Sequence, residues 1–341
     1  MKRKLTLILI SVIILTIPCF LSCKKNPYKV NISGISVEVH IKRLEKDLFT
    51  VDPLKIPDSI QTFKQKYGDF LKYFGYVINI GEPDDSTWTD GLIRFCTDRL
   101  NNEVFNETMK VFPDVQFIEK ELSLAFRYYK YYFSTKPIPA VFTCITGFNS
   151  SIIVGDSVLG IGLDRYLGKD CKYYPMLGLY NYQIVKMTPE YVVPDAIYAW
   201  ISSEWDAGQA SQNVLSEIIR EGKFMYVKKC LLPDLQDEMI FGFTPEQMRF
   251  CRDNEGMMWQ YLVENNLLFS TDQITIRKLI GEAPFTSYFT KESPGRAAVW
   301  IGFRIIESFM KNNRGLSVEE MMKFKDYQQI LEKAKYSPQK L

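Results

Sequence analysis

The stretch NVLSEIIREGKFMYVKKCLLPD, residues 213–234, is the segment around which we expect the rest of the chain to be organised. Its apolar residues recur at steps of one and three positions, which places them on one face of an α-helix. That face is formed by Val214, Leu215, Ile218, Ile219, Gly222, Met225 and Tyr226. Gly222 lies near its middle, where a glycine costs roughly 1 kcal/mol relative to alanine. We therefore expect another element to pack against Gly222 too closely for a side chain.

Two carboxylates lie on this predicted helix. Glu217 and Glu221 are four residues apart, which is about one turn, and Glu221 falls just off the edge of the apolar face. A carboxylate at the border of a buried surface can be a metal ligand or a catalyst, or it can form an ion pair with a basic residue. Ion pairing is the commoner arrangement, and the sequence leaves both interpretations open.

The composition allows a large core and disfavours nucleic acid as a partner. The chain has 341 residues, of which 46% are hydrophobic and 14% aromatic, and its formal net charge is +2. Three of the basic residues fall in an N-terminal segment that we expect to be removed, and no basic patch is interleaved with aromatic residues. His40 is the single histidine, so chemistry that needs two or more histidines is excluded.

The N-terminus has the pattern of a bacterial lipoprotein signal peptide over residues 1–22. Three basic residues precede an apolar run over residues 5–21, and a small residue, Ser22, stands directly before Cys23. We expect cleavage before Cys23 and attachment of fatty acyl chains, palmitate among them, which would hold the mature chain on a membrane. The alternative is an uncleaved membrane anchor, and both interpretations place the rest of the chain outside the cytoplasm.

Lys24 and Lys25 follow the predicted lipidation site. Lipoproteins exported to the cell surface often carry acidic residues there, so the two lysines favour a lipid-anchored protein of the outer membrane that faces the periplasm. Residues 23–34 are predicted to be a lipidated tether. Residues 35–341 contain no linker or repeat and are predicted to form a single domain.

The pattern along that domain predicts an α+β fold that is mostly helical, with one small antiparallel or mixed sheet. Helical periodicity dominates residues 57–133 and returns from residue 195 onward, whereas strand-like runs cover residues 140–145, 151–154 and 158–163. An alternating run over residues 35–41 predicts a further strand. The cysteines of the mature domain show no C-x-x-C spacing, so we expect neither a disulfide framework nor a metal, and no cofactor.

A third carboxylate, Glu255, is predicted to be buried. It falls in the middle of the apolar face of a helix that follows a capping box at residues 244–247. A buried carboxylate needs a partner or a proton. Lys223 and Arg296 are the partners that we expect for Glu255.

Several stretches, in this order, carry a family resemblance. They are LSEIIREGKFMYV (residues 215–227), LPD (232–234), FTPEQ (243–247), LLFSTD (267–272), APFT (283–286), PGR (294–296) and KYSP (335–338). With the signal peptide, they resemble the gliding-motility lipoprotein GldB family of Bacteroidetes over most of the mature chain. The resemblance implies an envelope lipoprotein, a structural or assembly component of gliding-motility or related secretion machinery, with protein components of that apparatus as partners.

That family in turn is similar to putative zinc peptidases, which carry H-E-x-x-H on one helix and E-G-x-A on a later one. Glu221 and Gly222 match the E-G pair, but the earlier helix should fall near residues 196–205, AIYAWISSEW, which contain no histidine. Zinc in such sites is held by two histidines on consecutive turns, with the glutamate between them as base. The resemblance therefore implies a degenerate zincin-like metallopeptidase fold without zinc, in which Glu217, Glu221 and Gly222 are remnants of the site.

Three functions are consistent with the sequence. The favoured one is a non-catalytic lipoprotein that acts through protein contacts, since no complete catalytic set is visible. A hydrolase acting on peptide or cell wall would need an unusual site, such as a carboxylate pair formed by Glu217 and Glu221 with separated pKa values. A peptidoglycan- or glycan-binding module would use a tyrosine-rich surface.

Overall fold

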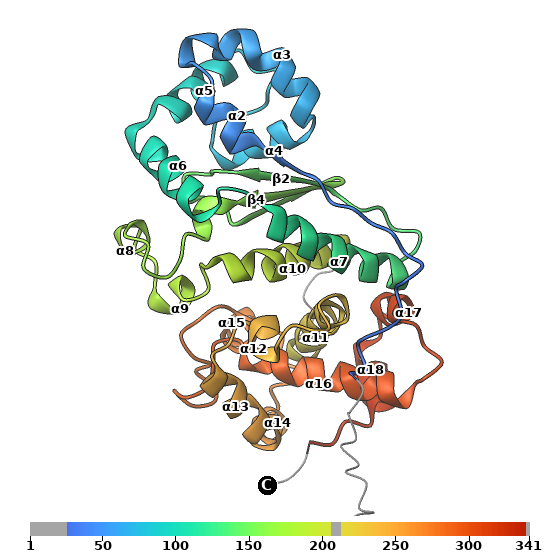
Figure 1. The fold of residues 1–341 in the computed structure, drawn as a ribbon. Coiled ribbons are helices and arrows are strands. Elements are labelled where there is room, and N and C mark those ends of the chain that lie inside the picture. The colour runs from blue at the N-terminus through green and yellow to red at the C-terminus, as the bar shows by residue number, and fades with distance from the viewer. Residues whose placement is uncertain (1–25, 206–212, 339–341) are drawn as a thin grey trace, which may run out of the picture.

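The computed structural model describes residues 26–205 and 213–338 (Figure 1). Within these residues, a small sheet lies between an upper group of helices and a larger lower half made almost entirely of helices. The predicted α+β class, mostly helical with one small sheet, is confirmed, and the sheet is mixed rather than antiparallel. Cys23 and the signal peptide lie outside the described residues.

The sheet has the strand order β1-β2-β4-β3. Strands β1, β2 and β4 run parallel, and β3 pairs antiparallel with β4. The strands are β1 (Ile41–Arg43), β2 (Ala140–Cys144), β3 (Ile152–Gly155) and β4 (Val158–Gly162). The three strands that the sequence predicts over residues 140–163 are therefore present, and β3 and β4 are joined by a tight turn at Asp156 and Ser157.

The upper helices pack their aromatic residues onto one face of the sheet. Phe70 of α4, for example, stacks on Phe142 of β2 with ring centroids 4.5 Å apart. Helices α7 and α10 cover the other face (Figure 1). The helices on the two faces of the sheet and beside it are α2 (Leu44–Thr50), α3 (Ile56–Tyr67), α4 (Phe70–Val77), α5 (Trp88–Thr97), α6 (Arg99–Val111), α7 (Gln116–Tyr132), α8 (Tyr173–Met176), α9 (Asn181–Ile184) and α10 (Val192–Trp205). Short 3-10 turns lie at Pro53–Lys55, Leu163–Arg165 and Pro189–Tyr191.

The lower half is built around α11 (Val214–Leu231), the helix predicted from residues 213–234. Asn213 caps it by accepting a hydrogen bond from the Ser216 amide at 2.9 Å. The other helices here are α12 (Asp237–Phe241), α13 (Pro245–Asp253), α14 (Glu255–Glu264), α15 (Gln273–Ile280), α16 (Ala297–Asn312), α17 (Val318–Lys323) and α18 (Tyr327–Ala334). The expectation of a single buried face on α11 is wrong, because α10, α15 and α16 enclose it and four of its charged residues, Glu217, Glu221, Lys223 and Lys228, are buried as well.

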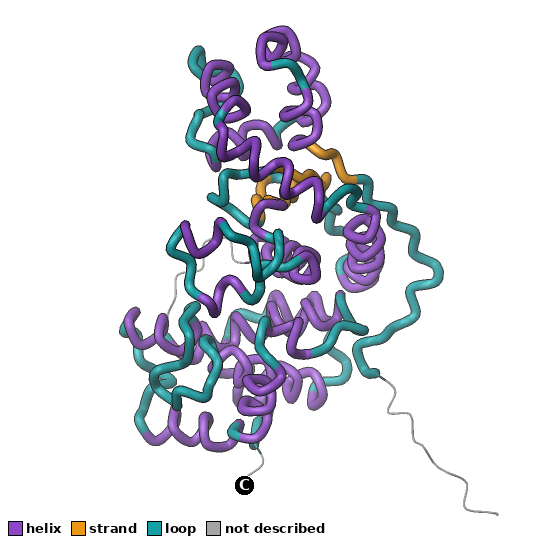
Figure 2. The backbone as a smooth tube through the Cα atoms, turned by 60° about the vertical axis from the view of Figure 1, so that its left-hand side comes forward, coloured by secondary structure: helices purple, strands orange, loops and turns teal. Residues whose placement is uncertain are grey.

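The strand predicted over residues 35–41 is mostly an extended segment outside the sheet. It runs along the outside of the molecule from the lower half to the upper half, where only Ile41–Arg43 joins the sheet (Figure 2). Side chains of α7 replace the missing strand partner: Arg127 donates to the Ile35 carbonyl at 2.8 Å, and Ser123 Oγ accepts from the Val39 amide at 2.9 Å. The alternating pattern therefore reflects packing on a helix.

A buried carboxyl fixes the loop that follows β2. Asp164 is fully buried and accepts hydrogen bonds from the backbone amides of Thr146 (3.1 Å) and Phe148 (2.6 Å). Burial outweighs these hydrogen bonds and raises the pKa of Asp164 to about 6. No cation pairs with Asp164 among the ion pairs of the described residues, so the loop is organised around an acid that is costly to ionise.

The Asp164 carboxyl should make stability fall as pH rises from about 4 to about 6. Its folded pKa lies above the unfolded value of about 3.9, so the folded chain binds the extra proton in this range and loses up to about 3 kcal/mol of stabilisation across it. Urea unfolding of the wild type and of Asp164→Asn should be measured at intervals between these pH values. The difference between the two curves gives the contribution of Asp164, because all other titrating groups are the same in both proteins. Parallel stability curves for the two proteins would contradict the assignment.

Candidate functional site

Helices α11 and α16 cross at a pair of glycines. A Cβ atom added to Gly222 would overlap the backbone of Gly302, and one added to Gly302 would overlap the carbonyl oxygen of Ile218. This is the close approach that the mid-helix glycine predicts. It brings the polar edge of α11, with Glu221, against the N-terminal end of α16.

Glu221 is held by two side chains. Arg296, the residue before α16, donates from Nη2 to Glu221 Oε2 at 2.8 Å, and the Tyr198 hydroxyl of α10 donates to the same oxygen at 2.8 Å. Arg296 also pairs with Glu282 at 3.3 Å and donates to the Ile280 carbonyl at 3.1 Å. The basic-residue interpretation of Glu221 therefore holds in this structure, in which the guanidinium and the Tyr198 hydroxyl both contact Oε2 of the carboxylate.

The two carboxylates of α11 form separate ion pairs. Glu217 forms its ion pair with Arg220, one turn further along α11, whereas Glu221 turns to Arg296. Carboxylates that work as acid and base need environments that separate their pKa values, and here each is neutralised by its own arginine. Among residues 26–205 and 213–338, no three His, Cys, Asp or Glu side chains are grouped so that they could hold a metal ion.

Two further charged residues lie near this site, the partly buried Asp195 and the buried Lys228, and the sequence did not single them out. Asp195 of α10 accepts a hydrogen bond from the Tyr166 hydroxyl at 3.0 Å, and burial raises its pKa. Lys228 of α11 donates to the Ile240 carbonyl at 2.8 Å, and burial lowers its pKa to about 8. The pattern of α11 contained a signal for the second charge, since the residues three and four positions from Lys228 are all apolar: Phe224, Met225, Leu231 and Leu232.

A half-open groove of about 1310 Å³, which we name the terminal groove, lies in the lower half of the molecule. Its walls come from Pro27 and Tyr28 near the N-terminus, from residues 335–338 near the C-terminus, and from helices α14 and α16. Trp300 and Phe303 of α16 supply aromatic surface. The groove therefore joins the two ends of the described chain.

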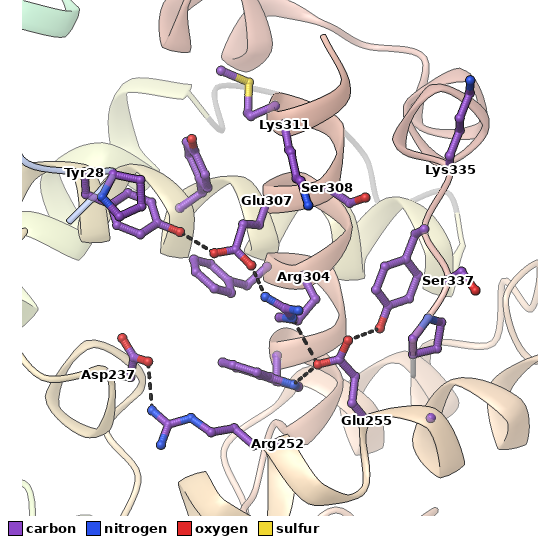
Figure 3. A pocket seen from close by; sticks show the side chains of 18 of the residues that line it. Tyr28, Asp237, Arg252, Glu255, Arg304, Glu307, Ser308, Lys311, Lys335 and Ser337 are labelled. Carbon is purple, nitrogen blue, oxygen red and sulfur yellow. Dashed lines mark hydrogen bonds and ion pairs between the residues drawn. The ribbon is translucent and has the colours of Figure 1, made fainter. Parts of the chain in front are cut away.

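A chain of hydrogen bonds and ion pairs crosses the floor of the terminal groove (Figure 3). Arg304 lies between two carboxylates, pairing with Glu255 at 3.0 Å and with Glu307. Tyr336 donates to Glu255 at 3.0 Å from one end, and Tyr28 donates to Glu307 at 2.7 Å from the other. The two terminal segments are thus connected through three charged side chains.

The partners expected for Glu255 are wrong. Glu255 is largely enclosed, with 13% of its side chain exposed, but it pairs with Arg304 and with the Trp300 indole rather than with Lys223 or Arg296. Lys223 instead donates to the Phe324 carbonyl and lies over the Tyr327 ring, 5.3 Å from its centroid. Arg296 precedes Trp300 and Arg304, the residues of α16 that Glu255 meets, by about one and two turns, and it reaches Glu221 instead.

A protein-family model described as gliding motility protein GldB matches residues 25–338. The chain belongs to the GldB family. It is accordingly a gliding-motility-associated lipoprotein of the cell envelope. No curated protein and no solved structure matched the chain. In the part of the chain that the structure describes, no helix combines the length and the apolar character needed to cross a bilayer.

The predicted tether of this GldB-family lipoprotein is fastened to its body. Asn26 donates to the Pro233 carbonyl at 2.8 Å, and Lys29 pairs with Asp234 at 2.8 Å. Between them, Tyr28 is buried against Tyr226, with the two rings edge to face at 5.6 Å. The body therefore holds the chain from residue 26 onward, three residues after Cys23.

Glu255→Gln is expected to lower the free energy of unfolding of the GldB-family chain by about 2 kcal/mol. The substitution leaves Arg304 with one carboxylate instead of two and weakens the hydrogen bond from Tyr336, in a largely enclosed site. Urea unfolding measures the loss, and digestion by carboxypeptidase should release residues after 335 faster. Glu264→Gln, at the exposed end of the same helix, is the matched control. Equal effects of the two substitutions would contradict a special role for Glu255.

Proposed function

We propose that this chain is a non-catalytic component of the gliding-motility machinery that acts through protein contacts. The observation that carries the proposal is the double occupation of Glu221, which Arg296 and Tyr198 hold at 2.8 Å each. The positive charge of a guanidinium at this distance repels a metal cation from the carboxylate. The carboxylate that the resemblance to zinc peptidases would assign to a site is committed to an internal ion pair. That Glu221 and Gly222 are remnants of a zinc site stays a prediction.

An exposed apolar patch supports the part of the proposal that concerns protein contacts. Helices α8 and α9 form a small projection that carries Met176, Leu177, Tyr180 and Val185 on its surface. Met176 is 78% exposed and Tyr180 66%. Large apolar side chains gathered in one exposed segment are typical of protein interaction sites.

Site-specific photocrosslinking in intact envelopes tests this role. A photoreactive residue at Tyr180 should give defined adducts with other envelope proteins, whereas one at Leu54, an isolated exposed leucine on the upper helices that is 87% exposed, should give none. Metal analysis of the purified mature chain, prepared without chelator or metal affinity, addresses catalysis directly. About one tightly held zinc ion per chain, with loss of the metal in Glu221→Gln, would overturn the non-catalytic role.

We further propose that Cys23 carries the lipid and that the protein is held in the outer membrane, facing the periplasm. The small residue before Cys23 and the two lysines after it support this arrangement. Cys23→Ser should release the chain from the membrane fraction. Removal of the protein from intact cells by added protease would show that it faces the outside and would overturn the orientation.

A further inference from the structure

The terminal groove opens close to the predicted lipid anchor. Asn26 is fixed to the Pro233 carbonyl, and three residues of chain span at most about 10 Å. Pro27 and Tyr28, the next two residues, form part of the groove wall. Once Cys23 is lipidated, the entrance to the groove must therefore lie near the membrane surface.

The rim of the groove carries three basic side chains, Lys311, Arg314 and Lys335. All three are exposed, and none forms an ion pair with another residue of the described chain. Lysines near helix C-termini can simply complement the helix dipole, which fits Lys311 and Lys335. Arg314 lies beyond the end of α16, however, and the three side chains border one cavity, so a shared ligand explains more of the arrangement.

The wall inside the groove is largely apolar, in contrast to the basic rim. Tyr226, Trp300 and Phe303 line it together with Met310 and Leu316, which gives an aromatic and aliphatic wall. The floor carboxylates, Glu255 and Glu307, share Arg304, so the floor keeps a net negative charge and repels an anion. A basic rim above an apolar wall suits an amphiphile whose anionic group stays at the entrance.

We propose that the terminal groove binds an anionic phospholipid of the membrane that holds the anchor. The lipid phosphate lies among Lys311, Arg314 and Lys335, and the first part of an acyl chain packs along Tyr226, Met310 and Leu316, which line the groove and are only partly buried. This inference rests on lipidation at Cys23 and is independent of the protein partners of the α8–α9 patch. It gives the chain a second attachment to the membrane and fixes its orientation there.

Vesicle flotation tests the electrostatic part of the proposal. The mature chain, residues 23–341, is made unlipidated with Cys23→Ser and mixed with vesicles of phosphatidylcholine, or of phosphatidylcholine and phosphatidylglycerol in equal amounts. Binding only to the second kind is expected. The triple variant K311Q/R314Q/K335Q should bind roughly 100-fold more weakly, since each basic side chain near an anionic surface contributes about fivefold. Equal binding of the wild type to both vesicles would overturn the proposal.

A matched control distinguishes binding in the groove from a general effect of net charge on vesicle binding. The variant K55Q/K120Q/K169Q removes three exposed lysines from other parts of the surface and changes the net charge by the same amount. It should bind the anionic vesicles within about twofold of the wild type, because these lysines lie outside the groove. If both triple variants lose binding equally, the interaction is general attraction to the surface and the groove has no part in it.

A soluble short-chain lipid tests occupancy of the groove itself. Dihexanoyl phosphatidylglycerol should shift the tryptophan fluorescence of the unlipidated chain saturably, and Trp300→Phe should abolish the shift. Inorganic phosphate should neither cause the shift nor compete with the lipid. Full competition by phosphate would mean that the site binds the ion and would overturn the lipid proposal, whereas crosslinking through Tyr180 would be unaffected by either outcome.

Discussion

Replacing Gly302 with alanine should lower the free energy of unfolding by at least about 3 kcal/mol. Alanine is normally the better helix former by about 1 kcal/mol, so the sign of the effect depends on packing. At this position the added Cβ would overlap the carbonyl oxygen of Ile218, a backbone atom of α11 that cannot turn away. The two central helices must separate or bend, and overpacking of this kind usually costs 1–3 kcal/mol or more.

Urea unfolding of the unlipidated mature chain measures the effect of Gly302→Ala. Gly34→Ala is the matched control, because a Cβ at Gly34 meets nothing within 4 Å, and it should change stability by less than about 0.5 kcal/mol. Gly222→Ala should resemble Gly302→Ala, and the double variant should cost less than the sum, since one separation of the helices relieves both overlaps. An unchanged midpoint for Gly302→Ala would show that α11 and α16 are not in this close contact.

Arg296→Met is expected to destabilise the chain by about 3–5 kcal/mol. Arg296 neutralises Glu221, which is only 8% exposed, and it also pairs with Glu282. Removing one partner of a buried ion pair leaves the other charge without compensation, and this accounts for most of the cost. Arg296 also has a left-handed backbone, with φ of 63°, so its side-chain contacts stabilise a strained position that methionine would keep without compensation.

A double-mutant cycle separates the ion pair from general loss of packing. Glu221→Gln alone keeps the hydrogen bond from Tyr198, and the double variant E221Q/R296M should cost clearly less than the sum of the single variants. Arg249→Met, an exposed arginine on α13, serves as the control and should change stability by less than about 0.5 kcal/mol. Strict additivity of E221Q and R296M would contradict direct pairing of the two residues.

The sequence predicts the elements of this fold better than the partners of its charged groups. Helix α11 follows from residues close together in the chain, and so does the need for a close neighbour at Gly222, although not the identity of that neighbour, Gly302. The partner of Glu255 does not, because Arg296 and Arg304 are both basic residues at the start and middle of one helix. Which of them meets Glu255 depends on how α14 and α16 are rotated against each other, and no local pattern contains that rotation.

Contact partners that lie far apart in the sequence could not be predicted for the terminal groove or for the first strand either. The groove brings Tyr28 and Tyr336 into one network through Glu307 and Glu255, although the two tyrosines lie at opposite ends of the chain. Alternation over residues 35–41 correctly predicts an extended backbone, but α7, rather than a neighbouring strand, supplies most of its partners. Hydrophobic periodicity describes which residues are covered and leaves open what covers them.

The fastening of residues 26–29 also determines how the molecule would carry mechanical load. A pull on the lipid anchor acts first on the contacts of Asn26, Tyr28 and Lys29, which hold the lower half near the membrane. If these contacts yield, the tension passes along the extended segment to β1, which lies parallel to β2 at the edge of the sheet (Figure 2). A force directed along β1 would load its hydrogen bonds to β2 together instead of opening them one at a time. The chain would thus carry the load through two attachments in series, the contacts of residues 26–29 and the pairing of β1 with β2.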